Sequence, residues 1–130
     1  MRGFEHIVGL RVVADPAAID AATWTTDHDA GAPVLRFAPD EAFSPGSTAV
    51  AVDDEHAIVV EEHGFVVKTC RLTDLLAHLD WAVPVERPTF TQGAVAGVPV
   101  KIWILNDTFI LLYTAAPYAH DLAERLGWLP

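Results

Sequence analysis

The pattern of apolar and polar positions predicts a strand and a short helix at the start of the chain. Residues 6–14 alternate loosely between apolar and polar side chains, as a half-buried strand does. An aspartate and a proline follow, which suit the N-cap and first turn of a short helix over 16–22. The polar segment 23–32 favours a loop and 33–37 a second strand, after which prolines and a glycine break the pattern over 39–46.

The middle of the chain predicts two strands and a helix. Residues 56–62 and 65–70 are apolar runs separated by His63-Gly64, which indicates a hairpin with a tight turn. Thr73 can cap a helix over 74–81, which later prolines end. Three leucines would share the apolar face of this helix: Leu75, Leu76 and Leu79.

The last part of the chain predicts a hairpin that leads into a helix. Residues 98–105 and 108–114 are rich in strand formers, and Asn106-Asp107 between them can take the left-handed conformations of a two-residue turn. A helix over 117–125 should end at Gly127. The pattern indicates these core residues: Ile102, Ile104, Phe109, Leu111 and Tyr118, with Leu122 and Leu126 on the helix.

Taken in order, these elements predict an α+β fold. A strand and helix precede a ββαββα unit, in which helices pack on a mostly antiparallel or mixed sheet. The length of 130 residues, 52% of them hydrophobic, suits one domain over 1–130 with its own core.

Charge and cysteine content narrow the functional classes. The net charge is −10, and the few basic residues are scattered singly, so neither nucleic acid nor an anionic membrane surface is an expected partner. Cys70 is the single cysteine and lies in an apolar run, which predicts a buried, inert thiol in a reducing compartment. Without a signal-peptide pattern or a long apolar run, the expected location is cytoplasmic.

Histidines flanked by acids are the natural place to search for a metal site. His28, His56 and His63 have such neighbours, but none shows the regular spacing of a metal-binding motif. His56 and His63 bracket one predicted strand and would be roughly 23 Å apart at about 3.3 Å per residue. Solvated acidic turns are the favoured interpretation, and no metal is predicted.

Catalytic groups are equally scattered. Ser44 and Ser47 lie in a segment without a nucleophile-elbow motif, and His120 and Glu124 form an ordinary solvated helical pair. The glycines in 93–97 precede a strand, so a turn or bulge is favoured over a phosphate loop. No catalytic residue is predicted. Two of the four tryptophans, at 81 and 128, sit at helix ends where they can close the core, and Trp24, in the acidic loop, is the most exposed candidate for binding.

Two stretches carry a family resemblance: FAPDEAF, residues 37–43, and TQGAVAGVPVKIWILNDTFILLYTAAPYAHDL, residues 91–122. In this order they resemble the γ subunit of heterotetrameric sarcosine oxidase and, more distantly, the folate-binding domain of glycine-cleavage aminomethyltransferases. The chain departs from that family in a shortened region between Phe43 and His56, and in Ala116-Pro117 where an Arg-Ser pair is usual. The resemblance implies a folate-binding-domain-like fold in an accessory chain, and it transfers no catalytic residue.

Three functional hypotheses follow. The first is a non-catalytic accessory domain that associates with itself or with a larger oxidoreductase or folate-dependent chain, through residues 24–29 or 53–56. The second is a tetrahydrofolate-dependent one-carbon enzyme or binding module, in which Trp24 contacts the ligand and Asp40 or Glu41 orients its pterin. Tetrahydrofolate is the only cofactor that any of the three requires. The third is an acidic immunity or inhibitor protein, supported by the charge alone.

Overall fold

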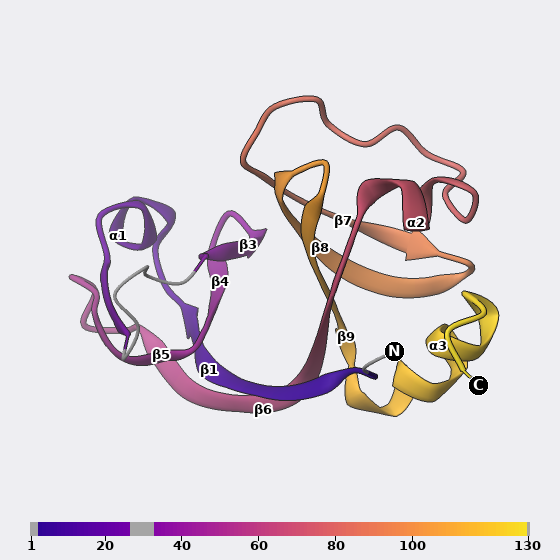
Figure 1. The fold of residues 1–130 in the computed structure, drawn as a ribbon. Coiled ribbons are helices and arrows are strands. Elements are labelled where there is room, and N and C mark those ends of the chain that lie inside the picture. The colour runs from indigo at the N-terminus through magenta and orange to yellow at the C-terminus, as the bar shows by residue number, and fades with distance from the viewer. Residues whose placement is uncertain (1–2, 27–32, 130) are drawn as a thin grey trace. The chain divides into compact units, whose positions relative to one another are not determined.

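Strands dominate the computed structural model, which describes residues 3–26 and 33–129. Within those residues there are nine strands, three α-helices and one 3-10 helix (Figure 1). The helices α1 (Pro16–Asp20), α2 (Leu72–Leu76) and α3 (Ala119–Arg125) have five, five and seven residues. The protein is therefore mostly β. The expected antiparallel pairing is present, whereas the α+β prediction overstated the helices.

The chain divides into two compact units. Unit 1 comprises residues 1–6 and 64–130, and unit 2 comprises residues 7–63. Two long strands, β1 (Glu5–Val13) and β6 (Ile58–Cys70), each contribute residues to both units. Residues 63–64 were predicted to form a hairpin turn, and this is wrong because β6 is continuous through them. Gly64 does not adopt a positive φ, so the chain stays extended there.

Unit 2 is built on antiparallel pairing around β4. The strands β3 (Leu35–Ala38), β4 (Glu41–Pro45) and β1 are neighbours in that order, and β2 (Thr23–Thr26) pairs with β5 (Ser47–Ala51) in a separate ladder. The predicted loop over 23–32 thus begins with a strand. The segment 39–46, predicted to be broken, contains β4, and β5 follows directly after it. The buried core of this unit consists of Val12, Ala14, Ile19 and Ala42.

Gly9 allows β1 and β4 to approach closely. It pairs with Pro45, and a Cβ at this position would overlap the Ser44 carbonyl oxygen and the Pro45 Cα atom. A side chain at position 9 would therefore push β4 away, which explains a glycine in the interior of this strand.

Unit 1 is an antiparallel sheet with the order β6-β9-β8-β7. Its other strands are β7 (Thr89–Val95), β8 (Val98–Asn106) and β9 (Phe109–Ala115). One face of the sheet is covered by α2 and α3 through Leu75, Leu122 and Leu126. The buried strand residues of this core are Val95, Val98, Val100, Ile102, Ile104, Ile110 and Leu112. Trp81 and Trp128 pack against it as predicted, although Trp81 lies beyond the end of α2 rather than at a helix end.

The turn between β8 and β9 differs from the prediction. Neither Asn106 nor Asp107 has a positive φ, and the Asn106 side-chain oxygen instead accepts hydrogen bonds from the Thr108 backbone N–H and hydroxyl. The pairing shifts between Ile104 and Asn106, so that Ile110 rather than Phe109 lies opposite Ile104. This irregularity reverses which β9 residues face the core.

The core predictions change accordingly. Ile102 and Ile104 are buried as predicted, but Phe109 is 42% exposed and Leu111 is only half-buried. Tyr118 is 47% exposed because it ends a 3-10 helix, η1 (Ala116–Tyr118), before α3 begins. Leu122 and Leu126 are buried as predicted.

The helix α2 is shorter than predicted. It begins after an N-cap at Arg71, whose backbone N–H donates to the Asp74 carboxylate, and not after Thr73. Five residues make little more than one turn, so Leu75 is the buried residue of this helix while Leu76 is 52% exposed. Leu79 lies beyond the end of α2 but still packs against the core, partly buried. Farther along the chain, the glycine segment before β8 forms a hairpin turn as expected, with positive φ at Ala96 and Gly97.

Candidate functional site

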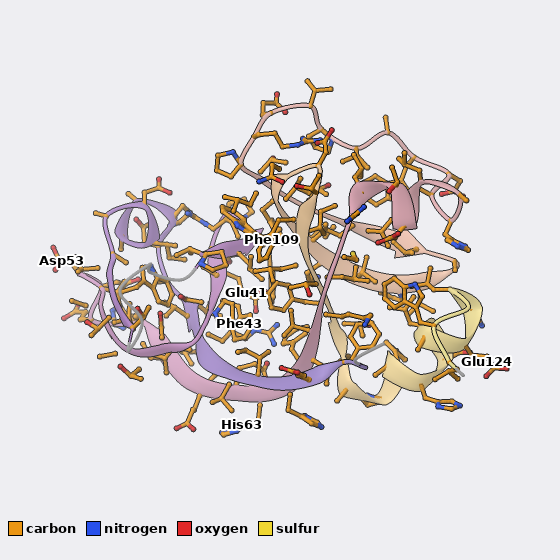
Figure 2. The ribbon with its side chains drawn as sticks, in the orientation of Figure 1. Glu41, Phe43, Asp53, His63, Phe109 and Glu124 are labelled. Atoms are coloured by element: carbon orange, nitrogen blue, oxygen red, sulfur yellow. The ribbon has the colours of Figure 1, made fainter. Side chains whose placement is uncertain are left out.

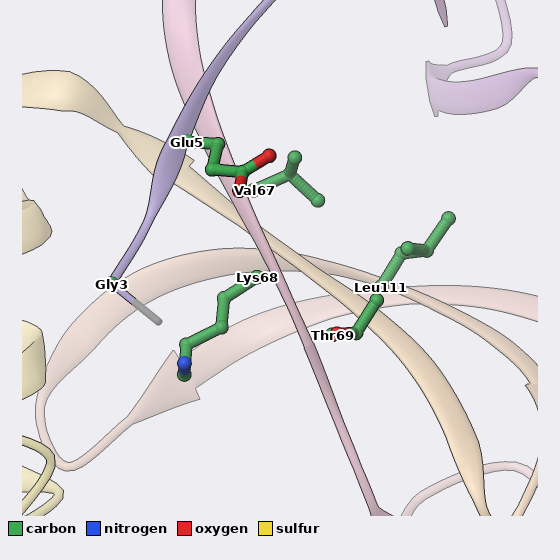
Figure 3. A pocket seen from close by; sticks show the side chains of 6 residues that line it. All are labelled: Gly3, Glu5, Val67, Lys68, Thr69 and Leu111. Atoms are coloured by element: carbon green, nitrogen blue, oxygen red, sulfur yellow. The ribbon is translucent and has the colours of Figure 1, made fainter. Parts of the chain in front are cut away.

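A pocket in unit 1 lies beside β6 and the first residues of the chain. It has a volume of about 150 Å³ and is lined by Gly3, Glu5, Val67, Lys68, Thr69 and Leu111 (Figure 3). Lys68 is only 9% exposed, and its Nζ lies 5.2 Å from the centre of the Trp128 ring, a cation–π contact. Lys68 extends to the opposite side of the β6 ribbon from Thr69 and Leu111 (Figure 3). The ammonium and hydroxyl groups therefore do not converge on one ligand position.

The three residues proposed as ligand contacts lie in unit 2. Trp24 is on β2, half-buried, and packs against the core rather than standing exposed in a loop. It lines a hollow of about 330 Å³ with Arg36, among others. The Arg36 guanidinium is already bonded to the Asp20 carboxylate at 2.7 Å and to two backbone carbonyl oxygens, at Pro16 and Pro39. Thr25 and Thr26 of the predicted binding loop belong to β2, and residues 27–29, including His28, lie outside the described residues.

Glu41 belongs to an ion-pair cluster on three strands. On β1, the Arg11 Nε donates to the Glu41 carboxylate on β4 at 2.8 Å, and Glu41 is labelled in Figure 2. The Arg11 Nη1 donates to the Glu62 carboxylate on β6, also at 2.8 Å. The guanidinium also lies 5.5 Å from the centre of the Phe37 ring. Burial alone would lower the pKa of Arg11, but the hydrogen bonds to Glu62 and Glu41 outweigh it and raise that pKa. Glu41 is thus engaged by a neighbouring arginine.

Asp40 has a different surrounding from Glu41. It occupies the exposed turn between β3 and β4, where its backbone carbonyl accepts a hydrogen bond from the Ala14 N–H at 3.0 Å. The structure places neither carboxylate beside the hollow that Trp24 lines. The three candidate contacts therefore do not share one cavity.

The possible nucleophiles are protected. Ser44 and Ser47 are buried and bonded to each other through their hydroxyl oxygens at 2.6 Å. Burial, with a smaller contribution from the Asp74 charge, raises the pKa of the Cys70 thiol to about 12. Since the thiolate is the reactive form, this cysteine is poorly suited to nucleophilic chemistry near neutral pH.

Four of the five histidines that the structure describes are exposed, at positions 6, 56, 63 and 120. His120 and Glu124 lie 3.9 Å apart on α3 with both side chains more than two-thirds exposed, and Figure 2 shows Glu124 at the outside of that helix. Across residues 3–26 and 33–129, no three His, Cys, Asp or Glu side chains are grouped for a metal ion. A third hollow, of about 410 Å³ beside α2, contains His78 and Asp80 but is otherwise lined by small and apolar residues.

The most unusual surface is the start of β6, in unit 2. Ile58, Val59 and Val60 are 59%, 43% and 47% exposed. We call Ile58–Glu61 the β6 arm. A strand with one buried face alternates apolar and polar residues, whereas here consecutive apolar side chains are exposed on both faces.

A well-ordered acidic turn precedes the β6 arm. The Asp54 carboxylate accepts hydrogen bonds from the backbone N–H groups of Asp15 and His56, at 2.8 and 2.9 Å. These two bonds lower the pKa of Asp54. Asp53 and Glu55 on either side of it are exposed, and Asp53 and His63 point away from the ribbon in Figure 2.

No protein family, no curated protein and no solved structure matches this chain. In the portion of the chain that the structure describes, no helix has the length and apolar character required to cross a bilayer.

Proposed function

We propose that this chain is a non-catalytic interaction domain that binds another protein chain through the β6 arm. The observation that carries the proposal is the exposure of Ile58, Val59 and Val60 on both faces of one strand. Runs of exposed apolar residues reduce solubility, and on the surfaces of soluble proteins they mark contacts with other molecules.

The distribution of reactive groups supports the same proposal. Among the described residues, the serines bond to each other, burial favours the protonated cysteine thiol, and no three His, Cys, Asp or Glu side chains are grouped for a metal ion. An active site requires a nucleophile or base together with groups that orient it. The chain is therefore better suited to binding than to chemistry.

The sequence resemblance suggests what kind of partner to seek. An accessory chain similar to the γ subunit of sarcosine oxidase would associate with a larger oxidoreductase or folate-dependent chain, or with a second copy of itself. A folate-binding-domain-like fold belongs to the same proposal. The region around Asp53–His56, expected from the sequence to be a binding surface, lies directly before the β6 arm.

The proposal is tested by removing the apolar surface. We expect the wild-type protein to retain one chain from an extract of its source cells in stoichiometric amount, or to self-associate in sedimentation velocity. Val60→Lys should abolish this association. Val85→Lys is the matched control, because Val85 is 86% exposed in a loop of unit 1. A wild-type protein that stays monomeric and retains nothing would refute the proposal, as would full binding by Val60→Lys.

One observation favours the tetrahydrofolate hypothesis as a second candidate. The hollow that Trp24 and Arg36 line has a volume within the range of small-molecule sites, roughly 300–1,000 Å³. Titration with tetrahydrofolate should then change the tryptophan fluorescence, and Trp24→Phe should remove that change. No response at millimolar ligand would eliminate this candidate.

A further inference from the structure

We infer that the β6 arm binds an extended segment of another protein that is rich in lysine or arginine and pairs with the arm as an additional strand. This inference rests on the proposed function and specifies its partner. It follows from the edge of the strand, from its exposed side chains and from the charge around it.

The edge of the β6 arm extends beyond its ladder with β9. That ladder runs from Phe65, opposite Ala115, to Cys70, opposite Ile110. The arm begins seven residues before Phe65, and β1 lies on its other side, as the contact between Arg11 and Glu62 shows. Within residues 3–26 and 33–129, β1 and β9 are the strands beside β6, and the β9 ladder does not reach the arm. A strand that continues past its neighbour can pair with an incoming chain through its backbone N–H and C=O groups, and extended peptides bind in this way.

Both faces of the arm can contribute side-chain contacts. Ile58 and Val60 are two and four residues from Glu62, so they project toward the same face as the ion pair with Arg11. Val59 projects toward the opposite face. An added strand would place its own alternate side chains beside these residues, and such cross-strand apolar pairs stabilise a sheet.

Charge selects the kind of segment. The sequence holds no lysine or arginine between Arg36 and Lys68. Asp53 and Glu55 are exposed before the arm, and Glu61, at its end, has a side chain that is 64% exposed. A second copy of this chain would bring the same acids to the edge, so of the partners considered above a different chain with lysine or arginine side chains fits this edge better than self-association does.

The acidic turn before the β6 arm reduces the conformational entropy that the arm loses when a partner binds. Asp54 ties the turn to the start of α1 through the Asp15 N–H and closes it through the His56 N–H. The Ala57 N–H donates to the Asp54 carbonyl oxygen at 3.1 Å, which leads directly into the arm. A surface that is ordered before binding loses less entropy when the partner arrives.

The test uses a fluorescent synthetic peptide of alternating valine and lysine and the full-length protein. We expect fluorescence anisotropy to show binding that weakens with added salt, and amide hydrogen exchange to slow across Ile58–Glu61. A peptide of alternating valine and glutamate should not bind. A valine–lysine peptide N-methylated at alternate residues keeps its charge but lacks the donors for strand pairing, so it should not bind either.

Variants of the protein locate the site. Val60→Lys should weaken binding of the valine–lysine peptide at least about tenfold, the scale of one important interface residue. Val85→Lys and Glu86→Lys, which change exposed residues of unit 1, should leave it unchanged. Circular dichroism and urea unfolding of each variant establish that it is folded.

Several outcomes would overturn the inference. Equal binding of the N-methylated peptide would indicate general charge attraction, and unaffected binding by Val60→Lys would place the site elsewhere. If no valine–lysine peptide binds but Val60→Lys still loses a chain captured from the extract, the partner chemistry is wrong while the interaction domain stands. If both binding and capture fail, both proposals fall.

Discussion

The packing of Trp81 on Gly93 yields the sharpest prediction about stability. Gly93 is in β7, and a Cβ there would lie 2.8 Å from two atoms of the Trp81 ring. The same ring donates a hydrogen bond from Nε1 to the Ala94 carbonyl oxygen at 2.8 Å. Gly93→Ala must therefore displace the tryptophan, because real Cβ atoms do not approach so closely.

The magnitude follows from three opposing effects. Loss of the Trp81 hydrogen bond costs about 1 kcal/mol. Re-exposing roughly 50 Å² of ring at about 25 cal/mol per Å² costs a similar amount. Alanine in a strand interior regains roughly 0.5–1 kcal/mol over glycine. We expect Gly93→Ala to lower the free energy of unfolding by about 1 kcal/mol, with a red-shifted tryptophan emission in the folded state.

The assay is urea unfolding followed by fluorescence, with two comparisons. Gly3→Ala is the matched control, since nothing lies within 4 Å of a Cβ at that position. In a Trp81→Ala background, Gly93→Ala should cost nothing or stabilise, because the obstructing ring is gone. The reasoning is refuted if Gly93→Ala is as stable as the wild type with unchanged emission, or if its cost persists without Trp81.

Three further predictions concern the core, a thiol and a carboxylate. Leu112→Ala, at a fully buried site, should lower the free energy of unfolding by about 2–5 kcal/mol, whereas Leu105→Ala, at a 47% exposed site of the same sheet, should change it by less than about 1 kcal/mol; equal effects would contradict the assigned core. Cys70 has a pKa raised from 9.0 to about 12, mainly by burial, so the unfolded chain loses this proton first as the pH rises. Stability should fall above pH 9, and fall less in Cys70→Ala; parallel pH profiles would count against this. The backbone N–H groups of Asp15 and His56 donate to the Asp54 carboxylate and lower its pKa in the folded protein below the ordinary 3.8. The carboxylate therefore stabilises the fold above pH 3.8, and this stabilisation is lost as the pH falls through the lower pKa of the folded state. Asp54→Asn should flatten the acid limb of the urea-midpoint profile, whereas Asp53→Asn should not.

Local patterns predicted the hairpin of β8 and β9 well, but not its register. Ile102 and Ile104 continue the two-residue spacing of the branched residues Val98 and Val100, so their burial could be inferred from sequence. In β9 almost every residue is apolar, and no period identifies the inward face. Because the pairing shifts between Ile104 and Asn106, Ile110 and Leu112 are the β9 residues that face the core. A bulge of this kind leaves little trace in the sequence.

The exposure of the candidate binding residues could not be predicted from the sequence. An apolar run such as Ile58–Val60 is read as a buried strand, and the sequence pattern led to the prediction of a hairpin at this place. Only the three-dimensional structure shows that the run is exposed. Likewise Trp24 was expected to be exposed because its neighbours are polar, yet pairing of β2 with β5 turns it toward the core. Exposure depends on tertiary neighbours that a local pattern does not contain.

The ion pairs of Arg11 bear on the register in which β1 and β4 pair. Side chains alternate along a strand, so a slip of one residue between β1 and β4 would carry Arg11 to the opposite face, away from Glu41. The apolar residues of β1 distinguish the two registers less well, because apolar side chains lie on both of its faces, Val12 on one and Val13 on the other. A half-exposed ion pair contributes little to stability, about 0–1 kcal/mol. Because these ion pairs would be lost in a pairing shifted by one residue, we expect Arg11 to favour the observed register of β1 and β4 over that alternative.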